Sequence, residues 1–170
     1  MAGPTLKMRN PMQSKLSTPA TEYLESRGVA YYIFHHPGDV NSVEQAAKER
    51  NQKPDQVVRS ILFRTAGSGF VLVLMPGPSQ INWKSLRSYL GKSRLTMATP
   101  EEVLETTGYP IGAVCPFGLK TALPILVDQS IKQQSEISLG SGQHSAALMM
   151  KTKDFLNALQ PGFEWVNFKE

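Results

Sequence analysis

The stretch that most constrains the fold of this chain runs from Gly108 to Asp128, where glycines and prolines surround a short apolar run. Gly112 and Gly118 can adopt backbone angles closed to other residues, and the prolines of the stretch fix φ and remove amide donors. The peptide groups between Gly112 and Pro116 are therefore candidates for a rigid rim of N–H donors, which could bind a carbonyl oxygen or a phosphate. A proline-rich turn between two strands is the alternative interpretation, since both residue types are common in loops.

The length of 170 residues, of which 41% are hydrophobic and 19% charged, predicts one globular domain with one core. The single cysteine, Cys115, excludes an internal disulfide and any Cys-x-x-Cys site. The longest apolar run, 70–75, is too short to cross a bilayer, and the N-terminus lacks the apolar segment of a signal peptide. We therefore expect a cytoplasmic protein without a membrane partner. The net charge of +4 and the pI near 9.2 permit a polyanionic partner without requiring one.

Capping and turn residues predict the order of the elements. Residues 1–17 have no apolar periodicity and are expected to be a flexible arm, followed by a domain over 18–170. Thr18, Ser42, Asn82 and Thr99 each occupy a helix N-cap position, and Gly28, Gly91 and Gly108 stop three of those helices. The helices expected from these signals lie at 18–28, 42–50, 82–90, 99–107 and 153–159.

Runs of β-branched and aromatic residues predict the strands at 29–36, 57–64, 70–75, 94–97, 125–128, 137–139 and 146–150, with 165–168 last. The second and third of these flank a glycine-rich turn and should pair as an antiparallel hairpin. Helices and strands interleave without the steady alternation of a doubly wound fold. The fold class is therefore α/β in the broad, α+β sense, with a mixed sheet flanked by helices.

Several segments in order resemble the YbaK and prolyl-tRNA editing family of aminoacyl-tRNA deacylases. The loop Gly112-Ala-Val-Cys-Pro116, followed by Phe-Gly-Leu-Lys and Leu-Pro, looks like the signature loop of that family. The likeness covers about residues 18–160 and includes four further segments: Thr18-Pro-Ala, the run 54–63, Ile81-Asn-Trp-Lys84 and Gly140-Ser-Gly142. The resemblance implies a curved, mostly antiparallel sheet of six or seven strands and an aminoacyl-tRNA ester as substrate.

The resemblance implies a site made of loop amides and one cation. Residues 112–116 (Gly112, Ala113, Val114, Cys115 and Pro116) are the expected catalytic loop, and Arg59 stands where the family typically has a lysine. Arginine keeps the charge but cannot act as a base, so a clamping role is expected for Arg59 and proton transfer is not. For Cys115, a small buried hydrophobic residue is the alternative to a nucleophile, and we favour packing. An acidic residue of one family branch is replaced here by apolar Ala147 or a neighbour.

The expected substrate-binding residues come from four segments. Val43 and Ala47, together with Ala46, should set the size of the pocket, and core packing is the alternative. Gly140 and Gly142 are expected to allow close approach of adenosine or the amino acid. The remaining members of the expected set are Ser60, His36 and His144.

The histidines leave a further alternative open. His35 and His36 are adjacent on an expected strand, so their side chains point to opposite faces and should not share a metal. For His36 and His144, a solvent-facing or structural imidazole is the alternative to substrate contact.

The resemblance implies a free-standing hydrolase that removes a small wrong amino acid, such as cysteine or alanine, from a proline tRNA. An aminoacyl ester is already activated, so oxyanion donors with a water, or with a group of the substrate itself, could suffice without metal or cofactor. The expected partners are the 3′ acceptor end of an aminoacyl-tRNA and an aminoacyl-tRNA synthetase, and not DNA. The alternatives are a tRNA- or synthetase-binding module without turnover, and a histidine metal hydrolase.

Overall fold

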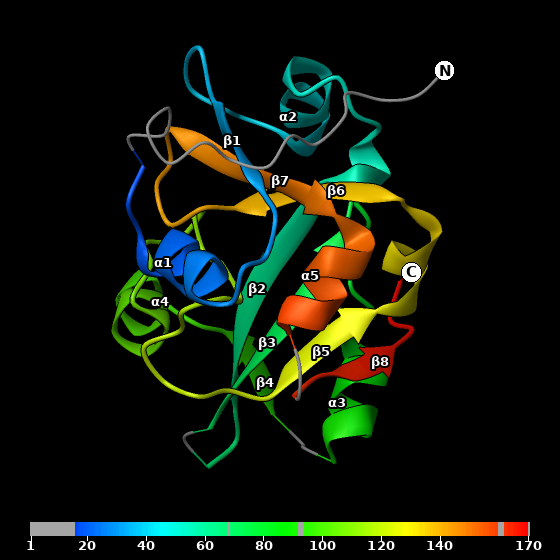
Figure 1. The fold of residues 1–170 in the computed structure, drawn as a ribbon. Coiled ribbons are helices and arrows are strands. Elements are labelled where there is room, and N and C mark those ends of the chain that lie inside the picture. Colours follow the sequence, from blue (N-terminus) through cyan, green and yellow to red (C-terminus); the bar gives the residue numbers. More distant parts are fainter. Residues whose placement is uncertain (1–15, 68, 92–93, 160–161, 170) are drawn as a thin grey trace.

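The computed structural model describes residues 16–67, 69–91, 94–159 and 162–169 of the chain. Within these residues the chain forms five α-helices and eight strands, which build one mixed α/β unit (Figure 1). The expected fold class is confirmed. Most of the expected N-terminal arm lies outside the described residues, but Leu16 at its end is buried. In the described part of the chain, none of the helices is both long and apolar enough to cross a membrane.

The helices begin where the capping residues predicted. The side chains of Thr18, Ser42, Asn82 and Thr99 each accept a hydrogen bond from the backbone N–H three residues later, which satisfies an amide of the first helical turn. The fifth helix begins without a side-chain cap. The bounds are α1 Pro19–Ser26, α2 Val43–Glu49, α3 Trp83–Leu90, α4 Pro100–Thr107 and α5 Thr152–Ala158, with 3-10 turns η1 Pro54–Gln56 and η2 Gln129–Gln133.

The strands form two sheets where the sequence predicted one. A five-stranded sheet has the order β4-β2-β3-β5-β8, and a three-stranded sheet has the order β1-β7-β6. Only β3–β5 and β5–β8 are parallel, so the pairing is mostly antiparallel as expected. The bounds are β1 Tyr32–His35, β2 Val58–Thr65, β3 Phe70–Pro76, β4 Leu95–Met97, β5 Ile125–Asp128, β6 Glu136–Gly140, β7 Ala146–Lys151 and β8 Glu164–Val166.

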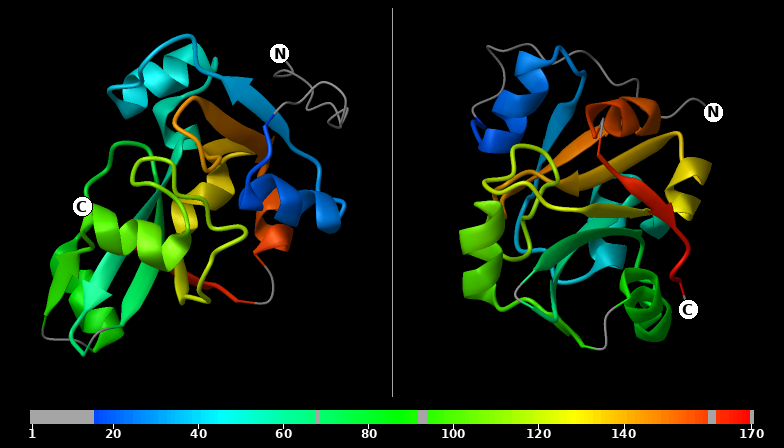
Figure 2. Two further views of the ribbon diagram at one scale, coloured as in Figure 1. Left: turned by 90° about the vertical axis from the view of Figure 1, so that its left-hand side faces the viewer. Right: turned by 90° about the horizontal axis from the view of Figure 1, so that it is seen from below.

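The two sheets meet at one point rather than along a continuous ladder. A single parallel bridge joins Val57, just before β2, to Ser138 in the middle of β6. The views in Figures 1 and 2 show the three-stranded sheet lying across one end of the five-stranded sheet. Beyond the bridge, part of one edge of β2 has no neighbouring strand among the described residues.

The five-stranded sheet is covered on both faces, and β3 is its most buried strand. Leu72 and Leu74 point into the larger core cluster, which also holds Phe155 of α5. Val71 and Val73 point the other way, into a cluster that includes Leu86 of α3. This alternation is that of a strand buried on two sides, and it explains why 70–75 reads as a continuous apolar run.

Candidate active site

A cavity of about 990 Å³ lies where the smaller sheet meets the open edge of β2. Its wall comes from five parts of the chain that are far apart in the sequence. These are residues 36–50 around α2, residues 57–62 of β2, residues 97–103 before and within α4, residues 111–114 of the glycine-proline loop, and residues 139–147 between β6 and β7.

The open edge of β2 presents polar backbone to this cavity. The carbonyl of Val57 accepts from Gly77 N on the β3 side at 2.8 Å, whereas the carbonyl of Leu62 accepts from Ala98 N on the other side at 3.0 Å. Because the backbone groups of a strand alternate in direction, Ser60 turns its N–H and C=O away from β3, as Leu62 does. The hydroxyl of Ser60 is also buried and finds no hydrogen-bond partner among the described residues. Ser60 is thus an unused polar group in the cavity wall.

The glycine-proline loop provides amides at the same cavity. Ala113 N donates to Pro110 O at 3.0 Å and closes a turn, so this amide is not available to a ligand. Gly112 and Val114 line the cavity, and their N–H groups donate to no other described residue. Gly112 has a φ of +88°, a conformation that side chains other than glycine rarely adopt. Two of the expected rim amides, those of Gly112 and Val114, therefore belong to residues of the cavity wall and have no partner in the described part of the chain.

The remaining loop residues pack behind the cavity instead of lining it. Ala113, Cys115 and Pro116 are buried, and none of them contributes to the cavity wall. Burial raises the pKa of the Cys115 thiol to about 12. A thiol held protonated in this way is a poor nucleophile, so the geometry agrees with a packing role for Cys115.

His144 joins the two loops that border the cavity. Its Nε2 lies 2.7 Å from the carbonyl oxygen of Ile111, one residue before Gly112. A carbonyl can only accept a hydrogen bond, so the Nε2 atom carries the proton, and in the neutral ring the lone pair is on Nδ1. A β-carbon at Gly112 would lie 3.3 Å from this same Nε2 atom. The loop can therefore approach the imidazole this closely because residue 112 has no side chain.

Gly140, the last residue of β6, lines the cavity, and Gly142 follows in the turn after it. A β-carbon at Gly140 would lie 2.3 Å from Val114 O, so the lack of a side chain lets the glycine-proline loop pack against β6. Contact of substrate with either glycine stays a prediction. Gly142 lies outside the cavity wall, and a β-carbon there would meet Tyr109 at 2.9 Å. The Thr18 hydroxyl donates to Ser141 O at 2.7 Å and fixes this turn to the start of α1.

Arg59 lines the cavity, but its guanidinium is already bound by the protein. Its Nε donates to Gly77 O at 2.7 Å, and an Nη donates to the carbonyl of Ser79. Burial lowers the pKa of the Arg59 guanidinium below its ordinary value. The observed contacts hold the turn after β3 against β2, and a clamp on substrate by Arg59 stays a prediction.

Helix α2 presents one of its faces to the cavity. Val43 and Ala46 line the wall, whereas Ala47 is buried and lies outside it. Arg50, one turn beyond Ala46, also lines the cavity and was not among the site residues expected from the sequence. The spacing of 43, 46 and 50 on one helical face was the signal that could have identified it.

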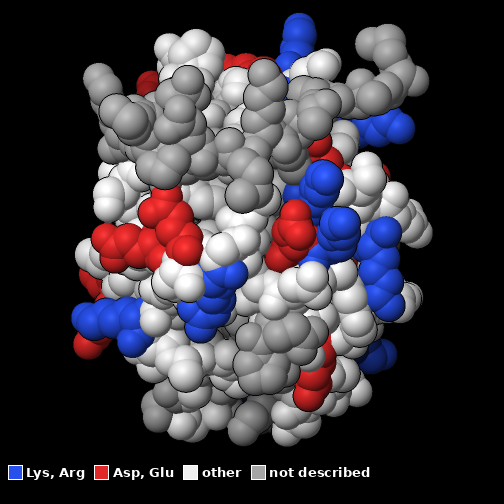
Figure 3. All heavy atoms as spheres, viewed as in Figure 1, with Lys and Arg blue, Asp and Glu red and all other residues white. Residues whose placement is uncertain are grey.

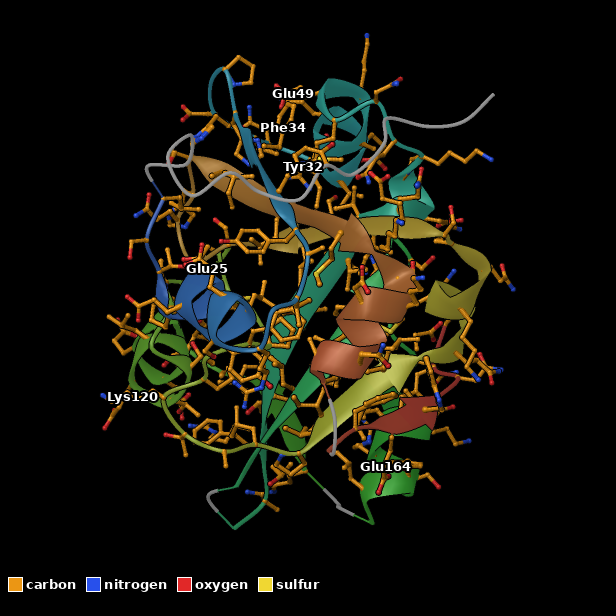
Figure 4. The ribbon with its side chains drawn as sticks, viewed as in Figure 1. Glu25, Tyr32, Phe34, Glu49, Lys120 and Glu164 are labelled. Carbon is orange, nitrogen blue, oxygen red and sulfur yellow. The ribbon has the colours of Figure 1, made fainter. Side chains whose placement is uncertain are left out.

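His35 is the last residue of β1, and His36 follows directly after it. His36 N donates to Ser145 O at 2.8 Å, and its half-buried ring lines the cavity, whereas His35 is exposed. The ring of His36 packs edge-on against Phe34 with centroids 5.7 Å apart. Figure 4 shows Phe34 on β1 and Glu49 on α2 at the same end of the molecule. Among the described residues, no group of three or more His, Cys, Asp or Glu side chains could hold a metal.

Exposed apolar side chains surround the mouth of the cavity. Val40, Met97 and Ile111 all line it and are 36%, 55% and 48% exposed. On the face shown in Figure 3, basic and acidic side chains lie among each other, and its visible described atoms show no single basic patch. Three exposed apolar side chains thus lie among the residues that line the cavity.

The comparison with protein families matches most of the chain. The sequence profile described as an aminoacyl-tRNA editing domain matches residues 37–158. A proline–tRNA ligase of Kosmotoga olearia is 38% identical over 111 residues, which are 65% of this chain and 19% of that protein. The chain thus spans about a fifth of the length of such ligases.

Free-standing relatives match over a larger share of their length. An Escherichia coli protein named multifunctional Ser/Thr-tRNA deacylase is 28% identical over 150 residues, which cover 86% of this chain and 88% of that protein. A crystal structure of a candidate trans-editing enzyme for prolyl-tRNA synthetase superposes with a TM-score of 0.80 at 29% identity, covering 92% of this chain and 99% of the other.

Proposed function

Because the chain belongs to the aminoacyl-tRNA editing domain family, we propose that it is a free-standing hydrolase that cleaves the ester of mischarged aminoacyl-tRNA. The observation that carries this proposal is the meeting of two unused loop amides with His144 and Ser60 in one cavity. Hydrolysis of an activated ester needs donors for the developing oxyanion and an acceptor that orients water. The described residues provide both kinds of group.

In this proposal the N–H groups of Gly112 and Val114 receive the ester carbonyl oxygen. Water attacks the carbonyl carbon while Nδ1 of His144 accepts its proton. The tetrahedral intermediate then expels the ribose oxygen, which takes the proton back from His144. The products are the free amino acid and a tRNA with its terminal hydroxyl restored.

The His144 step depends on the hydrogen bond to Ile111. This bond fixes the ring so that Nε2 is the donor and Nδ1 the acceptor. It also ties the orientation of the general base to the loop that carries the oxyanion donors. Base and donors would therefore move together, which preserves their mutual geometry.

The 3′ acceptor end of the tRNA would occupy the mouth of the cavity. Val40, Met97 and Ile111 offer an apolar surface on which the terminal adenine can pack, as bases commonly stack on apolar and aromatic side chains. The aminoacyl group would extend inward along Val43 and Ala46, which suits small side chains such as those of alanine, cysteine, serine or threonine. The ligase relatives support a proline tRNA as carrier and a synthetase as partner.

A deacylation panel tests this proposal. Each of these amino acids would be charged onto proline tRNA and incubated with excess protein, with correctly charged prolyl-tRNA as the negative control. We expect faster loss of at least one wrong amino acid than of proline. Binding of every aminoacyl-tRNA without any cleavage would contradict the proposal and support the alternative of a non-catalytic binding module.

The imidazole is tested with the same substrates. His144→Gln should slow the single-turnover rate by about 10²-fold, the usual size of a general-base contribution. His35→Gln on the exposed face of β1 is the matched control and should cleave at the wild-type rate. Equal rates for the two variants would remove His144 from the reaction.

A further inference from the structure

Arg50 is a buried cation in the cavity wall without a matching anion. Its side chain is only 9% exposed, and no described carboxylate lies within ion-pair distance of it. Glu49 is close enough to favour the charged form, but burial dominates and lowers the pKa of Arg50 to about 10. A guanidinium with that pKa is still charged at neutral pH. Keeping an unpaired charge in the interior costs stability, so its retention calls for a compensating role.

The hydrogen bonds of Arg50 leave part of its donor set unused. One Nη donates to Ser138 Oγ at 2.8 Å, and the other lies 3.4 Å from Nε2 of His36. The buried Nε of Arg50 has no partner in the described part of the chain. Ser138 in turn donates to Gln52 Oε1 at 2.6 Å, which holds the serine in place. The guanidinium carries five N–H donors. The contacts to Ser138 and His36 therefore leave Nη donors for a ligand in the cavity that Arg50 lines.

The position of Arg50 at the end of α2 indicates which part of a substrate its remaining N–H donors would contact. Val43, Ala46 and Arg50 follow one another along the cavity-facing side of α2, and the proposed aminoacyl subsite runs along the first two. We propose that Arg50 reads the side chain of the aminoacyl group by donating to an oxygen on it, and so selects amino acids with a side-chain oxygen over apolar ones of equal size. This inference rests on the proposed function and adds the residue that determines its specificity.

A phosphate of the tRNA backbone is a less suitable partner for Arg50. The polynucleotide must stay outside the mouth, where Met97 and Ile111 are exposed, whereas Arg50 is buried in the wall. A site built to donate to a substrate oxygen also discriminates strongly, because an apolar isostere leaves the buried donor unpaired. Serine against alanine and threonine against valine are therefore the informative pairs.

The test measures single-turnover deacylation of the same tRNA charged with serine, alanine, threonine, valine or aspartate. We expect the wild type to prefer serine to alanine and threonine to valine by between about 10- and 100-fold, the range for a hydrogen bond to a charged donor. Arg50→Met, which keeps the length of the stem, should bring both ratios close to one. The guanidinium should also accept the carboxylate of aspartate, so the wild type should cleave the aspartate substrate and Arg50→Met should cleave it more slowly.

Two controls separate recognition from folding. Lys48→Met removes an exposed cation from the same helix and should leave every ratio unchanged. The melting temperature of Arg50→Met should equal or exceed that of the wild type, because an unpaired buried charge has been removed.

The results can separate a failure of the role of Arg50 from a failure of the proposed deacylase activity. Unchanged ratios in Arg50→Met, an equal loss on all five substrates, or loss of activity that tracks unfolding would each overturn the role of Arg50. If the wild type cleaves none of the substrates while it binds them, the proposed function fails instead, and the inference fails with it.

Discussion

The thiol of Cys115 is fully buried beneath the glycine-proline loop, with its pKa raised by burial to about 12. Cys115→Ala should therefore keep the single-turnover rate within about twofold and cost about 1 kcal/mol of stability for the small cavity left behind. Native protein should also resist alkylation by iodoacetamide. An acyl group trapped on Cys115 would contradict this account.

The guanidinium of Arg59 binds the carbonyls of Gly77 and Ser79, and its charge strengthens both hydrogen bonds. Arg59→Lys should keep much of the activity, whereas Arg59→Ala should lower the deacylation rate by roughly 10-fold or more as the turn after β3 loosens. Rates measured on substrate with both variants, alongside their melting temperatures, check this expectation. A wild-type rate for Arg59→Ala would remove the residue from the mechanism.

The resemblance to a family pattern singled out Arg59, Gly112 and His144, and all three line the cavity. The sequence could not show that a side chain at Gly140 would collide with the carbonyl oxygen of Val114. The two residues are 26 positions apart and become neighbours only when the chain folds. Arg50 was missed because a charged residue near the end of a helix usually lies in solvent, and its burial depends on β6 beside it. The contact at Gly140 and the burial of Arg50 both depend on packing between segments that are far apart in the sequence.

At the scale of elements, the helix ends were the most predictable feature. Thr99 of α4 accepts from Glu102 N while the Glu102 side chain accepts from Thr99 N at 2.9 Å, which forms a complete capping box. Thr99→Ala should lower the free energy of unfolding by about 1 kcal/mol and leave the deacylation rate of the folded protein unchanged. Denaturant unfolding measures the first quantity. A loss of activity at unchanged stability would show that this end of α4 takes part in catalysis.

The positions of the strands were predicted better than the way in which the strands pair into sheets. Alternation and turn residues indicate where 58–65 and 70–76 run and that they pair, and the register from Val58 with Pro76 to Arg64 with Phe70 confirms the hairpin. The separation into two sheets depends on where β6 meets Val57, which local patterns do not contain. The same separation leaves the edge of β2 at Ser60 open, so the cavity could not be predicted from local patterns either.

The stability of the whole molecule should depend on pH through His36. Burial, and then the cation of Arg50, lower the pKa of His36 below its ordinary value of 6.5. The unfolded chain then binds this proton more readily than the folded one, so stability is full above that ordinary value and falls as pH drops below it. His36→Asn should flatten the change in unfolding free energy between about pH 7 and pH 5. His35→Asn on the exposed side is the control, and an unchanged slope in His36→Asn would contradict this reading.

The fold as a whole brings the loop of Gly112 to the open edge of β2, and the central claim is that its main-chain amides promote ester cleavage. Gly112→Ala compared with Gly67→Ala tests this most directly, because φ is +88° and +87° at the two glycines, but a β-carbon at Gly67 meets nothing within 4 Å. Backbone strain is thereby matched, and only one substitution disturbs the cavity. We measure the single-turnover deacylation rate and melting temperature of both variants. The account predicts similar melting temperatures, with a rate loss of about 10²-fold or more in Gly112→Ala alone. Full activity of Gly112→Ala, or a loss that merely follows unfolding, would contradict it.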